Sequence, residues 1–332
     1  MKSKIKVLLL VMAMACVCLA GCGKKEGTVT TTGQKGESDK LKVVTTIFAP
    51  YDFSRQIAGE DAKITMLLPP ASETHTFEPT PQDIINIQNC DVFVYIGGES
   101  DSWIEDVLKD IDTSKIKVIP LMKEVDLLEE ETVEGMQEEE HEHEHEHEHD
   151  GEEHQEEEYD EHIWTSPKNS IKIVEKLQQT FMEVDEANKD DYKKNGDSYI
   201  AELEELDAKF QNVVEHAERK TIVFGDRFPL RYFAEEYGLD YYAAFPGCAE
   251  DTEPSASTIA FLIDKVKEEK IPVVYHLELS NEKMADTICE STGAKKLLFH
   301  ACHNISKEDF ENGVTYVELM EKNVETLQEA LN

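Results

Sequence analysis

Positive charge is scarce in this 332-residue sequence, which has 33 Lys and Arg residues against 71 Asp and Glu residues. The formal net charge of −38 argues against a nucleic-acid-binding protein, because that class needs a basic footprint. The sequence also lacks a His-Glu-x-x-His helix, a nucleophile elbow and a phosphate-binding loop. These absences argue against the common hydrolase and nucleotide-binding classes, and the protein is not expected to be an enzyme.

No apolar stretch near the N-terminus is long enough for a comfortable membrane span, since the one at residues 7–20 is too short. Three lysines precede it, which is typical of an export signal. Residues 19–22 read LAGC and resemble a bacterial lipobox. The resemblance implies removal of residues 1–21, lipidation of Cys22 and a place on the extracytoplasmic face of the cell membrane. Two acyl chains on one residue hold a protein stably on a bilayer.

The rest of the chain alternates strand-like and helix-like segments after a Gly-, Thr- and Ser-rich tether at residues 22–40. Short apolar runs predict strands at residues 42–47, 64–68, 91–96 and 117–119, with helices between them. A second alternation begins with a strand at residues 221–224 and continues to a final helix at 314–331. Between the two lies helix-forming sequence that predicts two long helices, the second at about residues 191–219, with a break marked by Gly196 and neighbouring polar residues. This pattern predicts an α/β protein with parallel sheets in two lobes.

These predictions give a lobe at residues 41–187, a linking helix at 188–219 and a second lobe at 220–332. Open parallel sheets bind ligands beyond the carboxyl ends of their strands. The loops after Leu68, Phe224 and Phe299 are therefore expected to surround a ligand site.

Histidine alternates with glutamate through residues 141–149 within an acidic loop that spans residues 129–159. Neutral imidazole is a common ligand of zinc, and histidine-rich tracts are a compositional indication of metal binding. A solvated acidic linker would explain the glutamates but not the strict alternation. The predicted accessory metal ligands are His141, His143, His145, His147, His149 and His154.

Two further motifs lie outside this tract. Residues 75–81 read HTFEPTP, and residues 160–167 read DEHIWTSP. Both resemble motifs of the solute-binding lipoproteins of zinc and manganese ABC transporters. The segments GGESDSW at 97–103 and ESTGA at 290–294 also fit that family. The resemblance covers residues 41–331, and the histidine-rich insertion is typical of its zinc-directed members.

The family resemblance implies two α/β lobes joined by one long rigid helix, with the metal bound between them. Its first two ligand positions fall on His75 and His162, and the fourth falls on His300, with His303 as the alternative. The third position falls on Arg227, which stays protonated and cannot bind a metal. Asp226 could take that place, or the site could consist of three histidines and water. Arg227 is expected to pair with a carboxylate such as Asp226 or Glu253.

Four cysteines lie outside the export signal and the lipidation position: Cys90, Cys248, Cys289 and Cys302. The loops that carry Cys248 and Cys302 are both expected to face the cleft between the lobes. A disulfide between them is the leading prediction, although sequence alone does not assign pairing. Thiolate binding to zinc is the alternative.

The function that the resemblance implies is capture of zinc, with manganese as the less favoured metal, outside the cell. The metal would then pass to an ABC permease and its ATPase in the membrane, and the carrier is expected to be a monomer. The histidine-rich loop would collect zinc for a tighter site at His162. The alternatives are a zinc-buffering lipoprotein without a transporter and a zinc-dependent hydrolase that uses Glu78 or Asp226 as a base.

Overall fold

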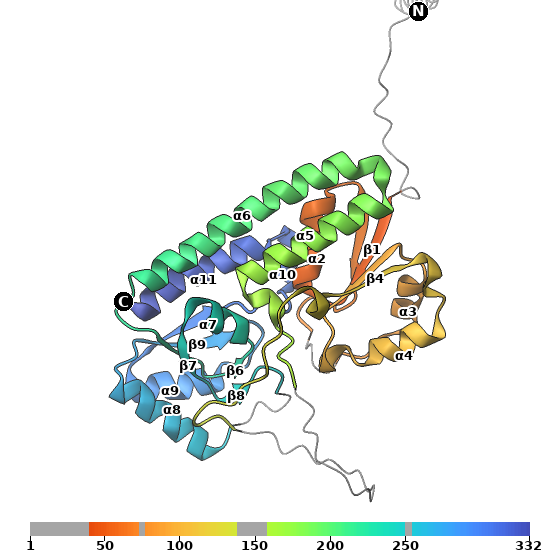
Figure 1. The fold of residues 1–332 in the computed structure, drawn as a ribbon. Coiled ribbons are helices and arrows are strands. Elements are labelled where there is room, and N and C mark those ends of the chain that lie inside the picture. Colours follow the sequence, from red (N-terminus) through yellow and green to blue (C-terminus); the bar gives the residue numbers. More distant parts are fainter. Residues whose placement is uncertain (1–39, 73–76, 138–157, 250–253) are drawn as a thin grey trace, which may run out of the picture. The chain divides into compact units, whose positions relative to one another are not determined.

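The computed structural model of this protein describes residues 40–72, 77–137, 158–249 and 254–332. In these ranges the chain forms an α/β fold with parallel strands and one long helix, α6, as Figure 1 shows. None of the helices in the described ranges combines the length and apolar character that crossing a bilayer requires. The predicted fold class is confirmed.

The first sheet has the strand order β2-β1-β3-β4, and every neighbouring pair is parallel. Its central strand places the β-branched residue Val43 beside Ile64 on one side and Val92 on the other. The strands are β1 (Leu41–Thr45), β2 (Ala62–Met66), β3 (Val92–Tyr95) and β4 (Lys117–Pro120). The helices of this half are α2 (Phe48–Ala58), α3 (Pro81–Gln88) and α4 (Trp103–Asp110).

The second half contains three parallel strand pairs, which are β9 with β10, β5 with β7, and β6 with β8. A bridge between Phe224 and Tyr275 connects the β5 pair to the β9 pair. The strands are β5 (Thr221–Val223), β6 (Arg227–Phe228), β7 (Asp240–Tyr242), β8 (Phe245–Pro246), β9 (Val273–Leu277) and β10 (Lys295–Phe299). The helices are α7 (Arg231–Tyr237), α8 (Ala256–Glu268), α9 (Lys283–Thr292), α10 (Lys307–Asn312) and α11 (Tyr316–Leu331).

Two long helices connect the halves, α5 (Pro167–Val184) and α6 (Lys189–Glu215). The two long helices were predicted, but the break between them lies at residues 185–188 and not at Gly196, which is inside α6. A Cβ at Gly196 would come within 2.4 Å of Gln178 Nε2 on α5, so glycine there allows close helix packing. Short 3-10 helices complete the described elements: η2 (Glu99–Asp101), η3 (Thr113–Lys115), η4 (Leu121–Glu124), η5 (Ile163–Thr165) and η6 (Glu186–Asn188).

A single buried apolar cluster contains residues from both sheets and from α6. Val43 and Phe53 belong to it in the first half, Phe210 in α6, and Phe224 and Phe299 in the second half. Helix α6 packs against α2, α5 and α11. Since close-packed interiors resist deformation, this continuous core holds the loops at the strand ends in fixed positions.

Candidate metal centre

His162 is a fully buried histidine at the start of a pair of consecutive helices. It immediately precedes η5, which leads into α5. Ser166 caps α5 by accepting the backbone N–H of Asn169, and Pro167 occupies the first helical turn, where its missing N–H costs nothing. The imidazole is 0% exposed. Local helix-start chemistry therefore fixes the backbone from which this side chain projects into the interior.

Asp160 orients the ring of His162. One carboxylate oxygen, Oδ1, accepts the backbone N–H of His162 at 2.8 Å and lies 3.1 Å from its Nδ1. An ionised carboxylate can only accept, so this contact assigns the ring proton to Nδ1 and the lone pair to Nε2. A carboxylate behind the far nitrogen is the usual support of a metal-binding histidine.

Asp160 is in turn held in place by both halves of the molecule. Its backbone N–H donates to Leu128 O at 3.0 Å, and the hydroxyl of Tyr232 on α7 donates to its carbonyl at 2.9 Å. Burial alone would lower the pKa of His162, but the charge and hydrogen bond of Asp160, followed by Glu161 and Glu130, outweigh it and raise that pKa. Protons consequently compete with a metal for this nitrogen.

A cavity of about 40 Å³ lies beside His162. Apart from His162, its walls come from β6, from the end of β9 and from the segments that follow β2, β6, β8, β9 and β10, in agreement with the strand-end rule. A single water needs roughly 10–15 Å³, so the cavity has the size of an ion or a few waters. The lining residues are Ser72, His162, Arg227, Pro229, Gly247, Leu277, Glu278, Leu279, Ala301, His303 and Asn304.

His303 is the histidine that the structure brings to His162. The two ring centroids are 5.2 Å apart and nearly perpendicular. Trp164 packs against both rings, at 5.4 Å from His162 and 4.9 Å from His303. The indole Nε1 also donates to Ala301 O at 2.8 Å, which ties the His162 segment to the His303 loop.

Glu278 sets the path of the loop that carries His303. Its carboxylate accepts the backbone N–H groups of Ala301 at 2.7 Å and His303 at 3.2 Å. Between them, Cys302 has a φ of 58°, in the left-handed region that non-glycine residues rarely adopt. Burial raises the pKa of Glu278 to about 7, although the backbone hydrogen bonds lower it. The turn at Cys302 directs His303 into the cavity.

His300 is not among the residues that line this cavity, so the geometry favours His303 over His300 for the fourth ligand position. Its backbone exchanges hydrogen bonds with Asn323, and its ring is surrounded by Lys322, Asp309 and His276. Burial, with a smaller contribution from Lys322, lowers the pKa of His300 to about 4. Strand-end position alone did not predict which histidine of the pair faces His162.

Asp226 and Arg227 both have structural partners. The carboxylate of Asp226 accepts the backbone N–H of Arg227 at 2.9 Å and that of Leu277 at 3.1 Å. Asp226 does not line the cavity of His162. Arg227 lines it and donates from Nη1 to Ala249 O at 3.1 Å. Glu253, one expected partner of Arg227, lies outside the described residues.

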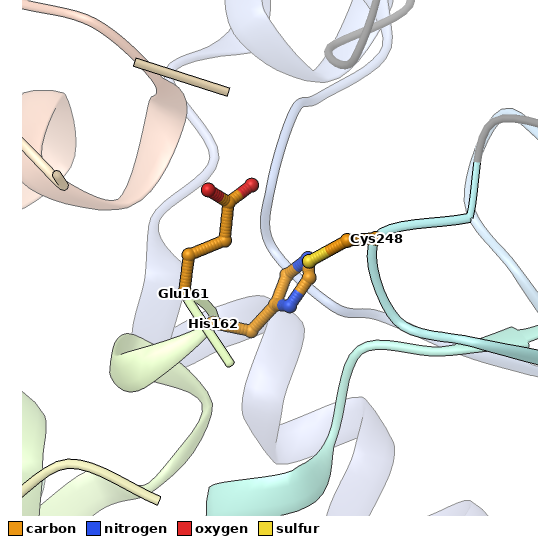
Figure 2. Close-up of side chains that lie close together, drawn as sticks. All are labelled: Glu161, His162 and Cys248. Carbon is orange, nitrogen blue, oxygen red and sulfur yellow. The ribbon is translucent and has the colours of Figure 1, made fainter. Parts of the chain in front are cut away.

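Cys248 lies close to His162, on a loop after β8. The ligand atoms of Glu161, His162 and Cys248 all lie within 4.8 Å of one another. Figure 2 shows the three side chains. In this view the sulfur approaches the imidazole, whereas the Glu161 carboxylate points away from it. That carboxylate accepts the backbone N–H of Ser100 at 3.2 Å and also the Ser100 hydroxyl. Burial, followed by the nearby carboxylates, raises the pKa of the Cys248 thiol well above its usual value.

The predicted disulfide between Cys248 and Cys302 is wrong. Both are free thiols, as are Cys90 and Cys289. Cys302 is 0% exposed and belongs to the apolar cluster, whereas Cys248 neighbours His162. Both lie in loops near the cavity, but the two side chains have different surroundings. The strand before Cys248, β8, has only two residues, so the sequence showed no pattern from which the position of Cys248 beside His162 could be predicted.

Several predicted site residues lie outside the described part of the chain: Cys22, His75, His141, His143, His145, His147, His149 and His154.

Ser72, the last described residue before the gap at 73–76, lines the cavity. Asn304 donates from its side chain to the carbonyls of Pro69 and Ser72 and so holds that segment to the His303 loop.

Replacement of Asp160 by Asn should weaken zinc binding by about 10–100-fold, the usual cost of losing the carboxylate behind a metal-binding histidine. The change keeps the shape of the side chain but removes the charge that supports the His162 ring. Competition with a calibrated zinc chelator measures the affinity. The matched control is Asp226→Asn, which changes another buried aspartate outside the cavity. Equal losses in both variants would contradict a specific role for Asp160.

Comparison with known proteins adds relatives at the level of both sequence and fold. The high-affinity zinc uptake system protein ZnuA of Bacillus subtilis (strain 168) is 35% identical, over 94% of this chain and 93% of the relative. The zinc-binding lipoprotein AdcA of Streptococcus pneumoniae (strain ATCC BAA-255 / R6) is 31% identical over 91% of this chain, which spans only 58% of that relative's length.

Two solved structures share the fold. The Zn(II)-bound ZnuA-like domain of Streptococcus pneumoniae AdcA superposes with a TM-score of 0.71 at 29% identity, over 88% of this chain and 99% of that one. The metal-dependent lipoprotein YcdH of Bacillus subtilis gives a TM-score of 0.72 at 30% identity, with the same coverage. Residues 43–330 match the family model described as zinc-uptake complex component A, periplasmic. The chain therefore belongs to the ZnuA family.

Proposed function

We propose that this protein is an extracytoplasmic zinc-binding component of an ABC transporter. One observation carries the proposal: a fully buried His162, oriented by Asp160, contacts His303 edge to face, and both line a cavity of about 40 Å³. The His162 imidazole and the Asp160 carboxylate are buried, and His303 is half-buried beside them. Burial of such polar groups costs free energy unless they are paired or bind an ion. A cation bound between the two histidines would offset the surrounding negative charge.

The ligand set that we propose contains His75, His162 and His303, with His303 in place of His300. The support for His303 is its position on the cavity wall beside His162. The support for His75 is that the described chain enters its segment at Ser72, which lines the same cavity. A nitrogen-rich set favours zinc over manganese, which prefers oxygen ligands.

Binding rather than catalysis is the proposed activity. The cavity has the size of an ion or a few waters. The related proteins are named as a zinc uptake protein and a zinc-binding lipoprotein. A hydrolase would also need a base beside a metal-bound water. Asp226 lies outside the cavity lining, and Glu278, which lines it, accepts two backbone N–H groups of the His303 loop.

The proposed destination of the metal is a membrane permease and its ATPase. Lipidation of Cys22 would keep the monomeric carrier at the membrane, with residues 22–40 as the tether. Residues 41–187 and 220–332 would be the two lobes, joined by residues 188–219. Purification of the full-length protein from membranes, followed by mass spectrometry of its N-terminal peptide, tests the anchor.

The histidine-rich loop is proposed to be an accessory collector. Residues 137 and 158 mark its two described ends, and the second lies four residues before His162. A backbone hydrogen bond from Glu130 to Glu158, at 2.9 Å, holds this end against the folded body. Zinc gathered by the loop would be released close to the buried site.

Deletion of residues 138–158 should remove several weak zinc sites and leave one tight site. The reason is that the residues around the cavity make their contacts with other parts of the chain. Isothermal titration with zinc, on chains with and without the loop, measures the number and strength of the sites. Loss of the tight site on deletion would contradict this division between collector and carrier.

A further inference from the structure

Arg227 occupies the position where the family resemblance places a metal ligand, and its guanidinium cannot take that role. The structure shows what Arg227 does instead. Its Nη1 donates to Ala249 O at 3.1 Å, and so it holds the backbone next to Cys248. Arg227 thus fixes the loop that carries Cys248.

The same loop is brought to His162 by strand pairing and close packing. Strand β6 pairs with β8, with Arg227 beside Phe245 and Phe228 beside Pro246. Gly247 follows at once, and a Cβ there would lie 3.1 Å from Phe228 O and 3.2 Å from Asp160 Oδ2. Only glycine allows this approach without displacing a neighbour. The next residue is Cys248.

We infer that Cys248 Sγ is a ligand of the zinc bound at His162 and replaces the side chain that Arg227 cannot supply. This inference deepens the proposed function and rests on it. The Cys248 sulfur, a His162 nitrogen and a Glu161 oxygen lie within 4.8 Å of one another. With Zn–N and Zn–S bonds near 2.0 and 2.3 Å, two tetrahedral ligands lie about 3.5 Å apart. A small side-chain rotation would bring the Cys248 sulfur and the His162 nitrogen to this separation.

Glu161 is not the ligand in this arrangement. Its carboxylate is committed to Ser100, and Figure 2 shows it directed away from the imidazole. Gly98 leaves room for this position of the carboxylate, since a Cβ there would lie 2.7 Å from Glu161 Oε2. Glu161 instead contributes a nearby negative charge that favours a cation.

The binding step exchanges a proton for the metal. The S–H bond of Cys248 breaks, a Zn–S bond forms, and the proton leaves to solvent. No oxidant or reductant takes part, and the charge of the cargo is partly neutralised by the thiolate. Because the thiolate is a soft ligand, this site would favour zinc over manganese more strongly than three histidines alone.

The test uses the chain without residues 138–158 and replaces zinc by Co²⁺, which gives a thiolate-to-cobalt charge-transfer absorption only when sulfur binds. We expect the band in the parent and in Cys289→Ser, and its loss in Cys248→Ser. Cys289 is a matched control, because it is a half-buried free thiol on α9. Zinc affinity should fall by about tenfold or more in Cys248→Ser, since even supporting residues cost 10–100-fold.

A second readout needs no mutation. Zinc should protect Cys248 from N-ethylmaleimide in the parent chain, as measured by peptide mass spectrometry, and should leave the labelling of Cys289 unchanged. A cobalt band that persists in Cys248→Ser, or equal labelling of Cys248 with and without zinc, would overturn the inference while zinc capture stands. A parent chain that binds neither metal would overturn the proposed function as well.

Discussion

Replacement of His162 by Ala in the chain without residues 138–158 should abolish tight zinc binding. Among the candidate ligands that the structure describes, His162 is the most buried, its ring is oriented by Asp160, and it lies close to both His303 and Cys248. Its loss removes the ligand beside which these two side chains lie. Zinc content after dialysis against a chelator, measured by mass spectrometry under native conditions, should fall from one ion to none.

His216→Ala is the matched control for this variant. His216 is exposed just after α6, and its ring Nδ1 lies 2.8 Å from the carbonyl of Asn212. Its replacement should leave one zinc bound, as should His300→Ala, since His300 lies away from the cavity. Retention of tight zinc by His162→Ala, with an unchanged circular dichroism spectrum, would contradict the proposed centre.

Replacement of Trp164 by Ala should lower the free energy of unfolding by about 3–5 kcal/mol, the usual range for a buried tryptophan. Its side chain is 1% exposed, packs against His162 and His303, and donates to Ala301 O. The variant leaves a cavity and an unsatisfied carbonyl, so a large part of a typical 5–15 kcal/mol stability is lost. Urea unfolding followed by circular dichroism measures the change.

Trp103 provides the comparison, because the sequence contains only two tryptophans. Trp103 is half-buried at the start of α4 and packs edge-on against Phe77, with ring centroids 6.0 Å apart. Trp103→Ala should therefore cost less than Trp164→Ala and should not change zinc affinity. A larger loss at Trp103 would show that Trp164 does not join the loops of the two halves as described.

Much of the fold could be predicted from local sequence. Apolar β-branched runs predicted all four strands of the first sheet to within a few residues, and their parallel pairing followed from the helices between them. The break was expected at Gly196 because glycine often ends a helix, but glycine also occurs inside helices where a neighbouring side chain needs space. Within α6 it makes room for Gln178, a contact that no periodicity in the sequence reveals.

The candidate site was harder to predict because it depends on contacts between distant residues. His300 directly follows a strand, whereas His303 reaches the cavity only because Glu278 binds the loop backbone and Cys302 adopts a left-handed conformation. Neither feature has a local sequence pattern. Strands β6 and β8 have two residues each, too few to show alternation, and they are what bring Cys248 to His162.

Anomalous diffraction at the zinc absorption edge, from crystals of the zinc-loaded chain without residues 138–158, tests the central claim most directly. The account predicts one strong peak about 2.0–2.1 Å from Nε2 of His162, with His303 beside it. A peak bound only by residues outside the cavity of His162, or no peak in protein that contains zinc in solution, would contradict the account.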